Sequence, residues 1–161
     1  MSQPLRRKQT YRAHGQQVVV VKRKHERIEH VWMKVFLWAL YLPDYPEATI
    51  EQDVPGRYKP DVVQMDRRRG RPVFWAEAGQ VHPEKIGRLL NHHPRTHLAL
   101  AKWDTRLDPL IAQIADAQRG GRVAPVDCWH FPSDSAERFI AEDGTVRVDT
   151  DHATRRRIMH A

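Results

Sequence analysis

The stretch Tyr58–Leu90, YKPDVVQMDRRRGRPVFWAEAGQVHPEKIGRLL, contains two short apolar runs, each with a carboxylate at one end, and then a helix start. The runs at 61–65 and 72–77 have the length and the β-branched and aromatic content that are typical of strands. A polar connection with glycine at a turn position joins them, which predicts an antiparallel hairpin with a basic tip. This pairing would bring Asp61 and Glu77 together at the end of the sheet where the next helix begins.

Further helices and strands are expected along the rest of the chain. Pro83 and Glu84 indicate a helix start after the second strand. Apolar residues at three- and four-residue spacing predict an earlier amphipathic helix from His25 to about Tyr41. Additional strands are expected at 17–22, 48–54, 97–101 and 123–131, and an additional helix at 104–118. This order of elements predicts one domain of the α/β class.

The composition fits a basic globular protein. The chain has 161 residues, a formal net charge of +7, 40% hydrophobic residues and 29% charged residues. This length suits a single domain with a core. The positive charge would attract a polyanion, most commonly nucleic acid, although a basic proteome or a need for solubility would give the same sum. The single cysteine, Cys128, cannot form an internal disulfide, and no apolar run approaches the length of a membrane helix. We expect a soluble cytoplasmic protein.

Both ends of the chain are more polar than its centre. Residues 1–15 hold four Lys and Arg residues with almost no apolar pattern, so a flexible basic arm is expected there. The α/β domain is expected to occupy residues 16–131. Residues 132–161 are polar and uneven, and they include a run of three arginines near their end. We therefore expect a polar C-terminal extension.

The helix expected at 25–41 carries acidic residues and histidines. Glu29 lies at the edge of its apolar stripe, where its carboxylate either reaches a site at the end of the sheet or pairs with His25 or Lys34 at helical spacing. A zinc-protease motif is excluded on geometry. His25 and His30 are five positions apart and point about 140° away from each other around the helix axis, whereas that motif needs a spacing of four.

Two carboxylates held close together, with a third from a nearby helix, supply the hard oxygen ligands that Mg²⁺ or Mn²⁺ prefers. Such a metal ion would polarise a phosphodiester and stabilise the leaving oxygen. Arginines near the site would hold a nucleic-acid backbone without reading its sequence. The candidates for these backbone contacts are Arg67, Arg68, Arg69, Arg71 and Arg88. In the simpler interpretation, the acids are ordinary strand-end residues and the arginines form a solvated turn.

With Pro60-Asp61, a hairpin, and then Glu77-Ala78-Gly79-Gln80 before a helix, the sequence resembles the PD-(D/E)xK nuclease superfamily. More narrowly, it resembles the YaeQ family, whose variant of the motif ends in Gly-Gln in place of x-Lys. The resemblance covers roughly residues 25–105. It implies a restriction-endonuclease-like fold, with a mixed central sheet flanked by helices. It also implies that Glu29, Asp61 and Glu77 take the metal-site positions of the superfamily.

The sequence departs from the superfamily at the motif lysine. Strict alternation along the strand puts that lysine position at Gly79, and Gln80 points to the opposite face unless the strand bulges or ends at Gly79. Otherwise Lys85 on the following helix, or Lys59 before the first strand, would have to reach the site. The catalytic candidates are therefore Asp61, Glu77, Gln80 and Lys85.

The sequence is compatible with three functions. The first is a Mg²⁺-dependent nuclease, which predicts that Asp61→Asn abolishes cleavage. The second is a catalytically weak or inactive nucleic-acid-binding protein of the same fold, because a glutamine lacks the charge of the lysine. It predicts salt-sensitive binding that survives the same substitution. The third is a protein-interaction module whose basic surface meets an acidic partner.

Overall fold

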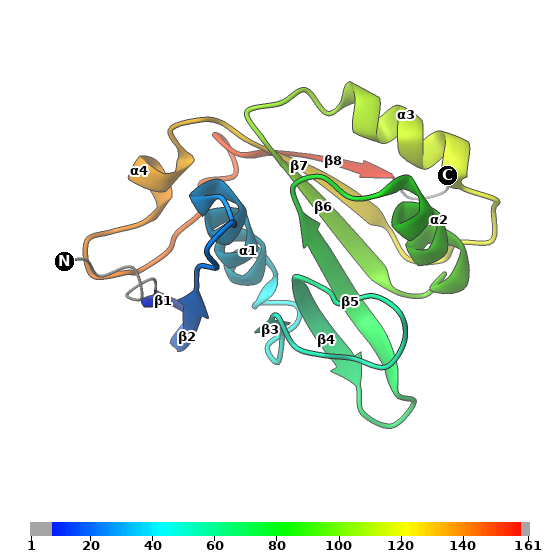
Figure 1. The fold of residues 1–161 in the computed structure, drawn as a ribbon, viewed down its shortest axis with the longest axis horizontal. Coiled ribbons are helices and arrows are strands. Elements are labelled where there is room, and N and C mark those ends of the chain that lie inside the picture. Colours follow the sequence, from blue (N-terminus) through cyan, green and yellow to red (C-terminus); the bar gives the residue numbers. More distant parts are fainter. Residues whose placement is uncertain (1–7, 159–161) are drawn as a thin grey trace.

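A six-stranded mixed sheet forms the centre of the computed structural model, which describes residues 8–158 (Figure 1). The strand order is β3-β4-β5-β6-β7-β8, with β5, β6 and β7 parallel and the other neighbours antiparallel. The strands are β1 (Lys8–Ala13), β2 (Gln16–Val21), β3 (Thr49–Ile50), β4 (Val62–Asp66), β5 (Arg71–Ala78), β6 (His97–Trp103), β7 (Val126–Phe131) and β8 (Thr154–Ile158). The helices are α1 (Ile28–Tyr41), α2 (Pro83–His92), α3 (Asp108–Ala117) and α4 (Ser135–Phe139). The expected α/β class and mixed sheet are confirmed.

The β4–β5 hairpin has the pairing that its sequence predicts. Val62 lies opposite Ala76 and Asp66 opposite Arg71, with a register shift at Gln64–Met65. Gly70 has a φ of +65° at the tip, a conformation that glycine adopts without steric cost. The expected antiparallel hairpin is therefore confirmed, and it places the ends of β4 and β5 that carry the acids side by side.

Helices cover both faces of the sheet. α1 packs on one face, while α2 and α3, which connect the parallel strands, pack on the other (Figure 1). The alternation of side chains in β5 follows from this arrangement. Phe74 and Ala76 belong to the core under α1, whereas Trp75 belongs to the core under α2 and α3. Glu77, two positions after Trp75, therefore faces the α2 side.

α1 is buried on more of its circumference than an amphipathic stripe predicts. Phe36 contacts the sheet residues Trp103 and Phe131 on one side, and Phe139 of α4 on another. The β1–β2 hairpin also lies against this helix, and the ring of His14 in its turn forms a 3.0 Å hydrogen bond with the carbonyl of Ala39. The helix consequently forms the centre of a layer, and even Lys34 on it is fully buried.

The expected boundaries of the domain need correction at both ends. Residues 8–13, expected in a flexible arm, form β1, which pairs with β2 over its whole length. The arm's Arg6 and Arg7 lie outside the described residues. In the expected C-terminal extension, β8 completes the central sheet by pairing with β7. The apolar pattern does not predict β8, because an edge strand with charged, exposed side chains buries few of them.

A buried carboxylate fixes β8 to the core. Asp127 is fully buried, and its oxygens accept hydrogen bonds from Tyr41, from His97 at 2.7 Å and from the Arg157 guanidinium at 2.7 and 3.1 Å. Burial alone would raise the pKa of Asp127, but the hydrogen bonds from His97, Arg157 and Tyr41 lower it well below its usual range. The C-terminal strand is thus an integral part of the domain.

No helix within residues 8–158 has both the length and the apolar content needed to cross a membrane.

Candidate functional site

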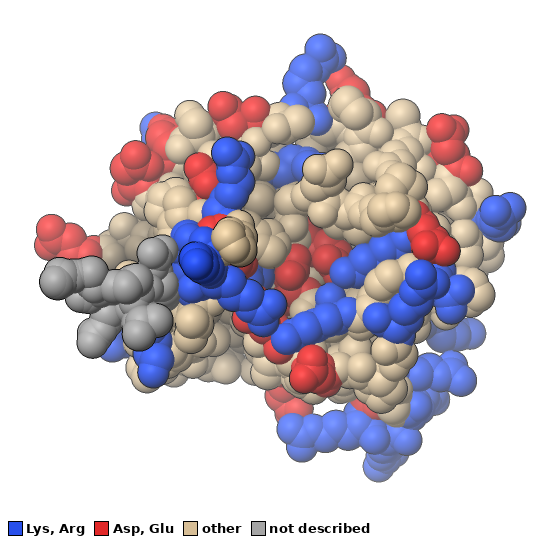
Figure 2. Space-filling view, viewed as in Figure 1, with Lys and Arg blue, Asp and Glu red and all other residues tan. Residues whose placement is uncertain are grey.

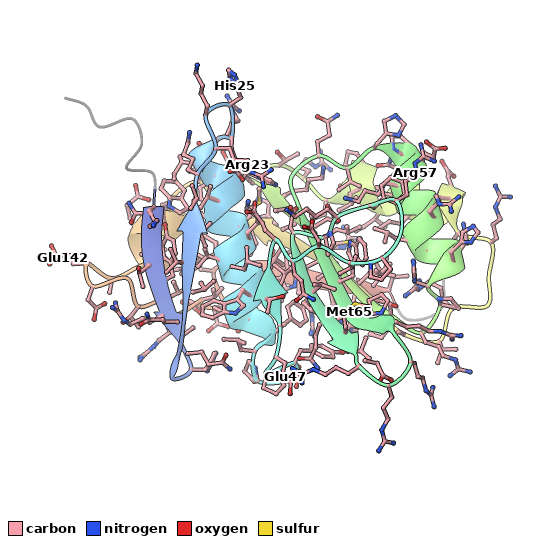
Figure 3. All side chains as sticks on the ribbon, turned by 60° about the horizontal axis from the view of Figure 1, so that its bottom comes forward. Arg23, His25, Glu47, Arg57, Met65 and Glu142 are labelled. Carbon is pink, nitrogen blue, oxygen red and sulfur yellow. The ribbon has the colours of Figure 1, made fainter. Side chains whose placement is uncertain are left out.

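Asp61 and Glu77 meet at the end of β4 and β5, as the hairpin predicts. The backbone N–H of Asp61 donates to the carbonyl of Ala76 at 3.1 Å, and one carboxylate oxygen of Asp61 accepts from the N–H of Ala78 at 2.7 Å. Asp61 therefore contacts both residues that flank Glu77 in β5. Figure 3 shows Arg23, His25 and Arg57 at the end of the molecule opposite Glu47.

Burial and a like charge control the protonation of Glu77. Glu77 is only 4% exposed. Desolvation by burial, and then the negative charge of Asp61, raise the pKa of Glu77 to about 7. The Lys85 ammonium and the Trp75 indole oppose this rise, since both contact Oε2 of Glu77, at 2.8 and 2.7 Å respectively. Burial and the charge of Asp61 together therefore outweigh the lysine beside Glu77.

Lys85 reaches back from α2 to the acids. It is one of the two lysines, with Lys59, that the sequence offers in place of the motif lysine. α2 begins at Pro83, so Lys85 lies in its first turn, near the end of the sheet. Its ammonium also donates to the carbonyl of Lys59 at 3.2 Å. The ammonium of Lys59 itself lies 3.6 Å from Asp53, so Lys59 contributes its backbone and not its charge to the Lys85 contact.

Gln80 and Glu29 lie in a neighbouring cleft of about 740 Å³, whose lining also includes His30. β5 ends at Ala78, and Gly79 has a φ of +81°, so the strand does not continue to Gln80, which is exposed. No hydrogen bond or ion pair within residues 8–158 joins Glu29 to Asp61 or Glu77. The structure thus brings Asp61, Glu77 and Lys85 together, whereas Gln80 and Glu29 line a separate cleft that also includes Ala78 and Gly79.

A row of charged residues on α1 and the turn before it also contacts Asp61, and the sequence interpretation missed it. His30 Nε2 lies 3.4 Å from the Asp61 carboxylate, and His30 Nδ1 lies 2.7 Å from Glu26. Lys34 lies 2.6 Å from the same Glu26 carboxylate and also pairs with Glu51. Positions 30 and 34 lie on one face of α1, and Glu26, two residues before the helix begins, continues the same four-residue spacing. That spacing was the available signal.

The α1 row is electrostatically coupled to the acids. The hydrogen bond with Asp61 raises the pKa of His30, because it favours the protonated ring. Burial alone would raise the pKa of Glu26, but the Lys34 ammonium holds it below its usual value. The alternative pairing of Glu29 with Lys34 is not observed, since Lys34 pairs with Glu26 and Glu51.

The acidic pair offers only part of a metal site. No three histidine, cysteine or acidic side chains gather as a metal site in the part of the chain that the structure describes. Asp61 and Glu77 nevertheless fit Mg²⁺, because this ion usually binds one or two carboxylates and keeps several waters. The pKa of Glu77 is raised by burial and then by the charge of Asp61, and a bound cation would favour the ionised carboxylate against both effects.

Basic side chains surround the acidic end of this face. Figure 2 shows acidic atoms in a hollow in the middle, Lys and Arg side chains around it, and a further basic group over the β4–β5 tip. All four predicted arginines of the tip are exposed, and so is Arg88 on α2. At the tip, Arg67 lies 3.2 Å from Glu47, an ion pair between two exposed side chains.

The chain has the mixed α/β fold that is found in solved YaeQ structures. It matches the YaeQ protein from Xanthomonas axonopodis pv. citri with a TM-score of 0.57 and 12% identity, over 90% of this chain and 86% of that one. It matches the YaeQ protein from Pseudomonas syringae with a TM-score of 0.57 and 17% identity, over 87% and 81% of the two chains. The predicted YaeQ-like fold is thereby confirmed. No family model and no curated protein matches the sequence.

Proposed function

We propose that this protein is a Mg²⁺- or Mn²⁺-dependent nuclease of the PD-(D/E)xK type. The observation that carries the proposal is the cluster of Asp61, Glu77 and Lys85 at the end of the hairpin strands. An aspartate on one strand, a glutamate on the next and a lysine beside it are the groups of that motif. Lys85 supplies the lysine from a helix, with its ammonium 2.8 Å from Glu77.

Each residue of the cluster has a defined task in phosphodiester hydrolysis. Asp61 and Glu77 present carboxylate oxygens to the cation, which when bound would polarise the phosphodiester. Lys85 places a positive charge beside Glu77, where it orients water and offsets charge that develops on the phosphate. His30 holds the Asp61 carboxylate from the side of α1. The exposed arginines of the hairpin tip attract the nucleic-acid backbone.

The test is a cleavage assay on single-stranded and duplex DNA and RNA with Mg²⁺, Mn²⁺ or Ca²⁺. We expect Mg²⁺ or Mn²⁺ to support cleavage, Ca²⁺ to block it, and Asp61→Asn to abolish it while the protein stays folded by circular dichroism. Asp53→Asn is the matched control, because the side chain of Asp53 is 92% exposed. Cleavage that persists in Asp61→Asn would refute the assignment.

A second candidate is a nucleic-acid-binding protein that does not cleave. The observation that favours it is the number of cations already in contact with the acids, since Lys85 contacts Glu77 and His30 contacts Asp61. It predicts binding that weakens with salt and is unchanged in Asp61→Asn, with no cleavage under any metal.

A further inference from the structure

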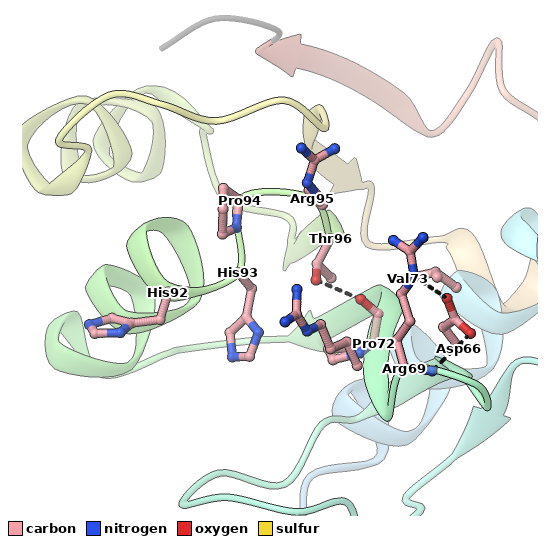
Figure 4. A pocket seen from close by; sticks show the side chains of 10 residues that line it. Asp66, Arg69, Pro72, Val73, His92, His93, Pro94, Arg95 and Thr96 are labelled. Carbon is pink, nitrogen blue, oxygen red and sulfur yellow. Dashed lines mark hydrogen bonds and ion pairs between the residues drawn. The ribbon is translucent and has the colours of Figure 1, made fainter.

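A second pocket lies near the opposite end of β5 from Glu77. It has a volume of about 440 Å³ and lies between the start of β5 and the α2–β6 connection (Figure 4). In Figure 4, Asp66 and Arg69 come from the hairpin, while His93, Arg95 and Thr96 come from the other wall. The charged and titratable residues of its lining are Asp66, Arg69, Arg71, His92, His93 and Arg95.

The pocket carries an excess of positive charge. Asp66 is its one acid, and the Asp66 carboxylate is engaged by the hairpin, where it accepts from the N–H groups of Arg68 and Arg69 at 3.0 and 3.4 Å. The Arg69 guanidinium lies 4.0 Å from it. Within residues 8–158, no ion pair involves the guanidinium of Arg71 or Arg95. Two arginines of the lining are thus available to a ligand.

Buried and partly buried hydrogen bonds hold the walls of the pocket in place. The Thr96 hydroxyl donates to the carbonyl of Pro72 at 2.6 Å, which links the two walls directly. Arg122, which is only 7% exposed, donates to the carbonyls of Leu90 and His93 at 2.8 and 3.1 Å. The backbone that presents Arg71 and Arg95 is therefore fixed before any ligand arrives, which reduces the ordering cost of binding.

Trp75 connects this pocket to the acidic site. Its ring stacks on His93 with a centroid separation of 6.1 Å and an interplanar angle of 26°, while its indole N–H donates to Glu77. Trp75 and Glu77 lie on the same face of β5, so one face of this strand joins the pocket to the Glu77 carboxylate. Arg71 and Glu77 are six residues apart in one strand, or about 20 Å at the usual rise of a strand.

We propose that this arginine pocket binds a phosphate group of a nucleic acid, several nucleotides away from the phosphodiester at Asp61 and Glu77. Arginine suits this ligand, because its planar fork donates two parallel hydrogen bonds to phosphate oxygens. The inference rests on the proposed nucleic-acid substrate and adds a second, built contact to it. The phosphate is either an internal phosphodiester or a terminal phosphomonoester.

The first test uses inorganic phosphate and backbone amide NMR spectra. We expect phosphate to shift the amide signals of Arg71, Arg95 and Thr96, and we expect these shifts to disappear in Arg71→Gln/Arg95→Gln. The matched control is Arg147→Gln/Arg155→Gln, which removes the same charge from two exposed arginines outside the pocket. Absent shifts in the wild type, or equal shifts in both double variants, would overturn the proposal.

The second test measures binding of a 12-nucleotide single strand, with and without a 5′-phosphate, in EDTA so that no cleavage occurs. We expect the Arg71/Arg95 variant to bind about tenfold more weakly and the control variant about twofold more weakly. A wild-type preference for the 5′-phosphate that the pocket variant loses identifies a terminal phosphate as the ligand. Equal affinity for both strands, with the same loss in the variant, identifies an internal phosphodiester. Equal losses in both double variants would overturn the proposal.

The two proposals fail separately. Asp61→Asn leaves the arginine pocket intact, so it should bind the 12-mer as the wild type does even if cleavage is lost. Binding that depends on Arg71 and Arg95 without any cleavage would remove the nuclease and keep the pocket. Cleavage that depends on Asp61, with binding indifferent to the two arginines, would remove the pocket and keep the nuclease.

Discussion

The ammonium nitrogen of Lys85 lies 2.8 Å from Oε2 of Glu77, although one residue belongs to a helix and the other to a strand. In the usual motif, the lysine follows the glutamate two positions later in the same strand. Here that position is Gly79, which ends the strand with a φ of +81°. In the proposed nuclease, the lysine would instead come from the first turn of the next helix, where Lys85 lies.

Replacing Lys85 with Met should reduce cleavage by about 100-fold or more, because it removes the charge that stabilises the developing phosphate charge. The same change should raise the pKa of Glu77 above about 7, since Lys85 is the main group that lowers it. Carboxyl NMR titration measures the pKa and a single-turnover assay measures cleavage. Lys59→Met is the control for the titration, because the Lys59 ammonium pairs with Asp53. An unchanged Glu77 pKa in Lys85→Met would contradict this contact.

Glu77→Gln should stabilise the folded protein above neutral pH. The folded-state pKa of Glu77 is raised to about 7, so the folded state keeps a proton that the unfolded state has already lost. Wild-type stability therefore falls as pH rises from about 4.5 to about 7, by about 3 kcal/mol, and is level above that range. The neutral amide avoids this loss.

Urea unfolding at pH 4 and pH 8.5 measures the effect of Glu77→Gln. The gain in stability should appear at pH 8.5 and be small at pH 4, where the wild-type carboxyl is already neutral. Glu84→Gln is the control, because Glu84 is an exposed acid at the start of the same helix that carries Lys85. A variant that is less stable than the wild type at pH 8.5 would show that Glu77 is ionised without cost.

The residues of the hairpin could be predicted because they depend on local signals. Turn chemistry and apolar runs set the pairing of β4 with β5, and this pairing alone brings Asp61 to Glu77. For the replacement of the motif lysine, the sequence leaves both Lys85 and Lys59 open. A predicted helix start places Lys85 only to within one turn. The contact of the α1 row with the acids could not be predicted, because His30 meets Asp61 only through tertiary packing. The apolar stripe of the helix points to Glu29 instead.

The ends of the domain could not be predicted for a different reason. β1 buries Tyr11 and Ala13 but is otherwise polar, and β8 exposes four of its five side chains. Both strands are held by backbone pairing and by a few long-range contacts, such as the guanidinium of Arg157 on Asp127. The pattern of hydrophobic residues does not indicate such contacts. It therefore predicts a flexible arm and a polar extension where the structure has β1 and β8.

His30→Ala should destabilise the protein by about 1–2 kcal/mol near pH 6 and by less at pH 8.5. The hydrogen bond with Asp61 raises the pKa of His30, so its stabilising effect is complete below the unfolded pKa of about 6.5. That effect is lost as pH rises through the folded-state pKa. Denaturant unfolding at both pH values is the measurement. His25→Ala in the preceding turn is the control, because His25 is exposed. An equal loss at both pH values would contradict the charge-assisted contact.

Asp127→Ala should cost about 3–5 kcal/mol of unfolding free energy, because it leaves the buried hydroxyl of Tyr41 and the ring of His97 without their shared acceptor. Arg157→Ala should cost less, since the Arg157 side chain is 35% exposed and water replaces part of the lost contact. Wild-type stability should also fall in acid, because the lowered pKa of Asp127 stabilises the fold above the unfolded pKa and this effect disappears as pH falls.

Urea unfolding of both variants, with Asp116→Ala on an exposed position of α3 as control, measures these costs. Amide hydrogen exchange adds the spatial information, because protection of the β7–β8 backbone hydrogen bonds should be lost in Arg157→Ala before protection of the β5–β6 bonds. Loss of β8 protection with an unchanged core would mean that the strand adds little to stability. A cooperative loss across the whole sheet in Asp127→Ala would mean that the buried carboxylate joins the C-terminal strand, α1 and the parallel strands into one folding unit.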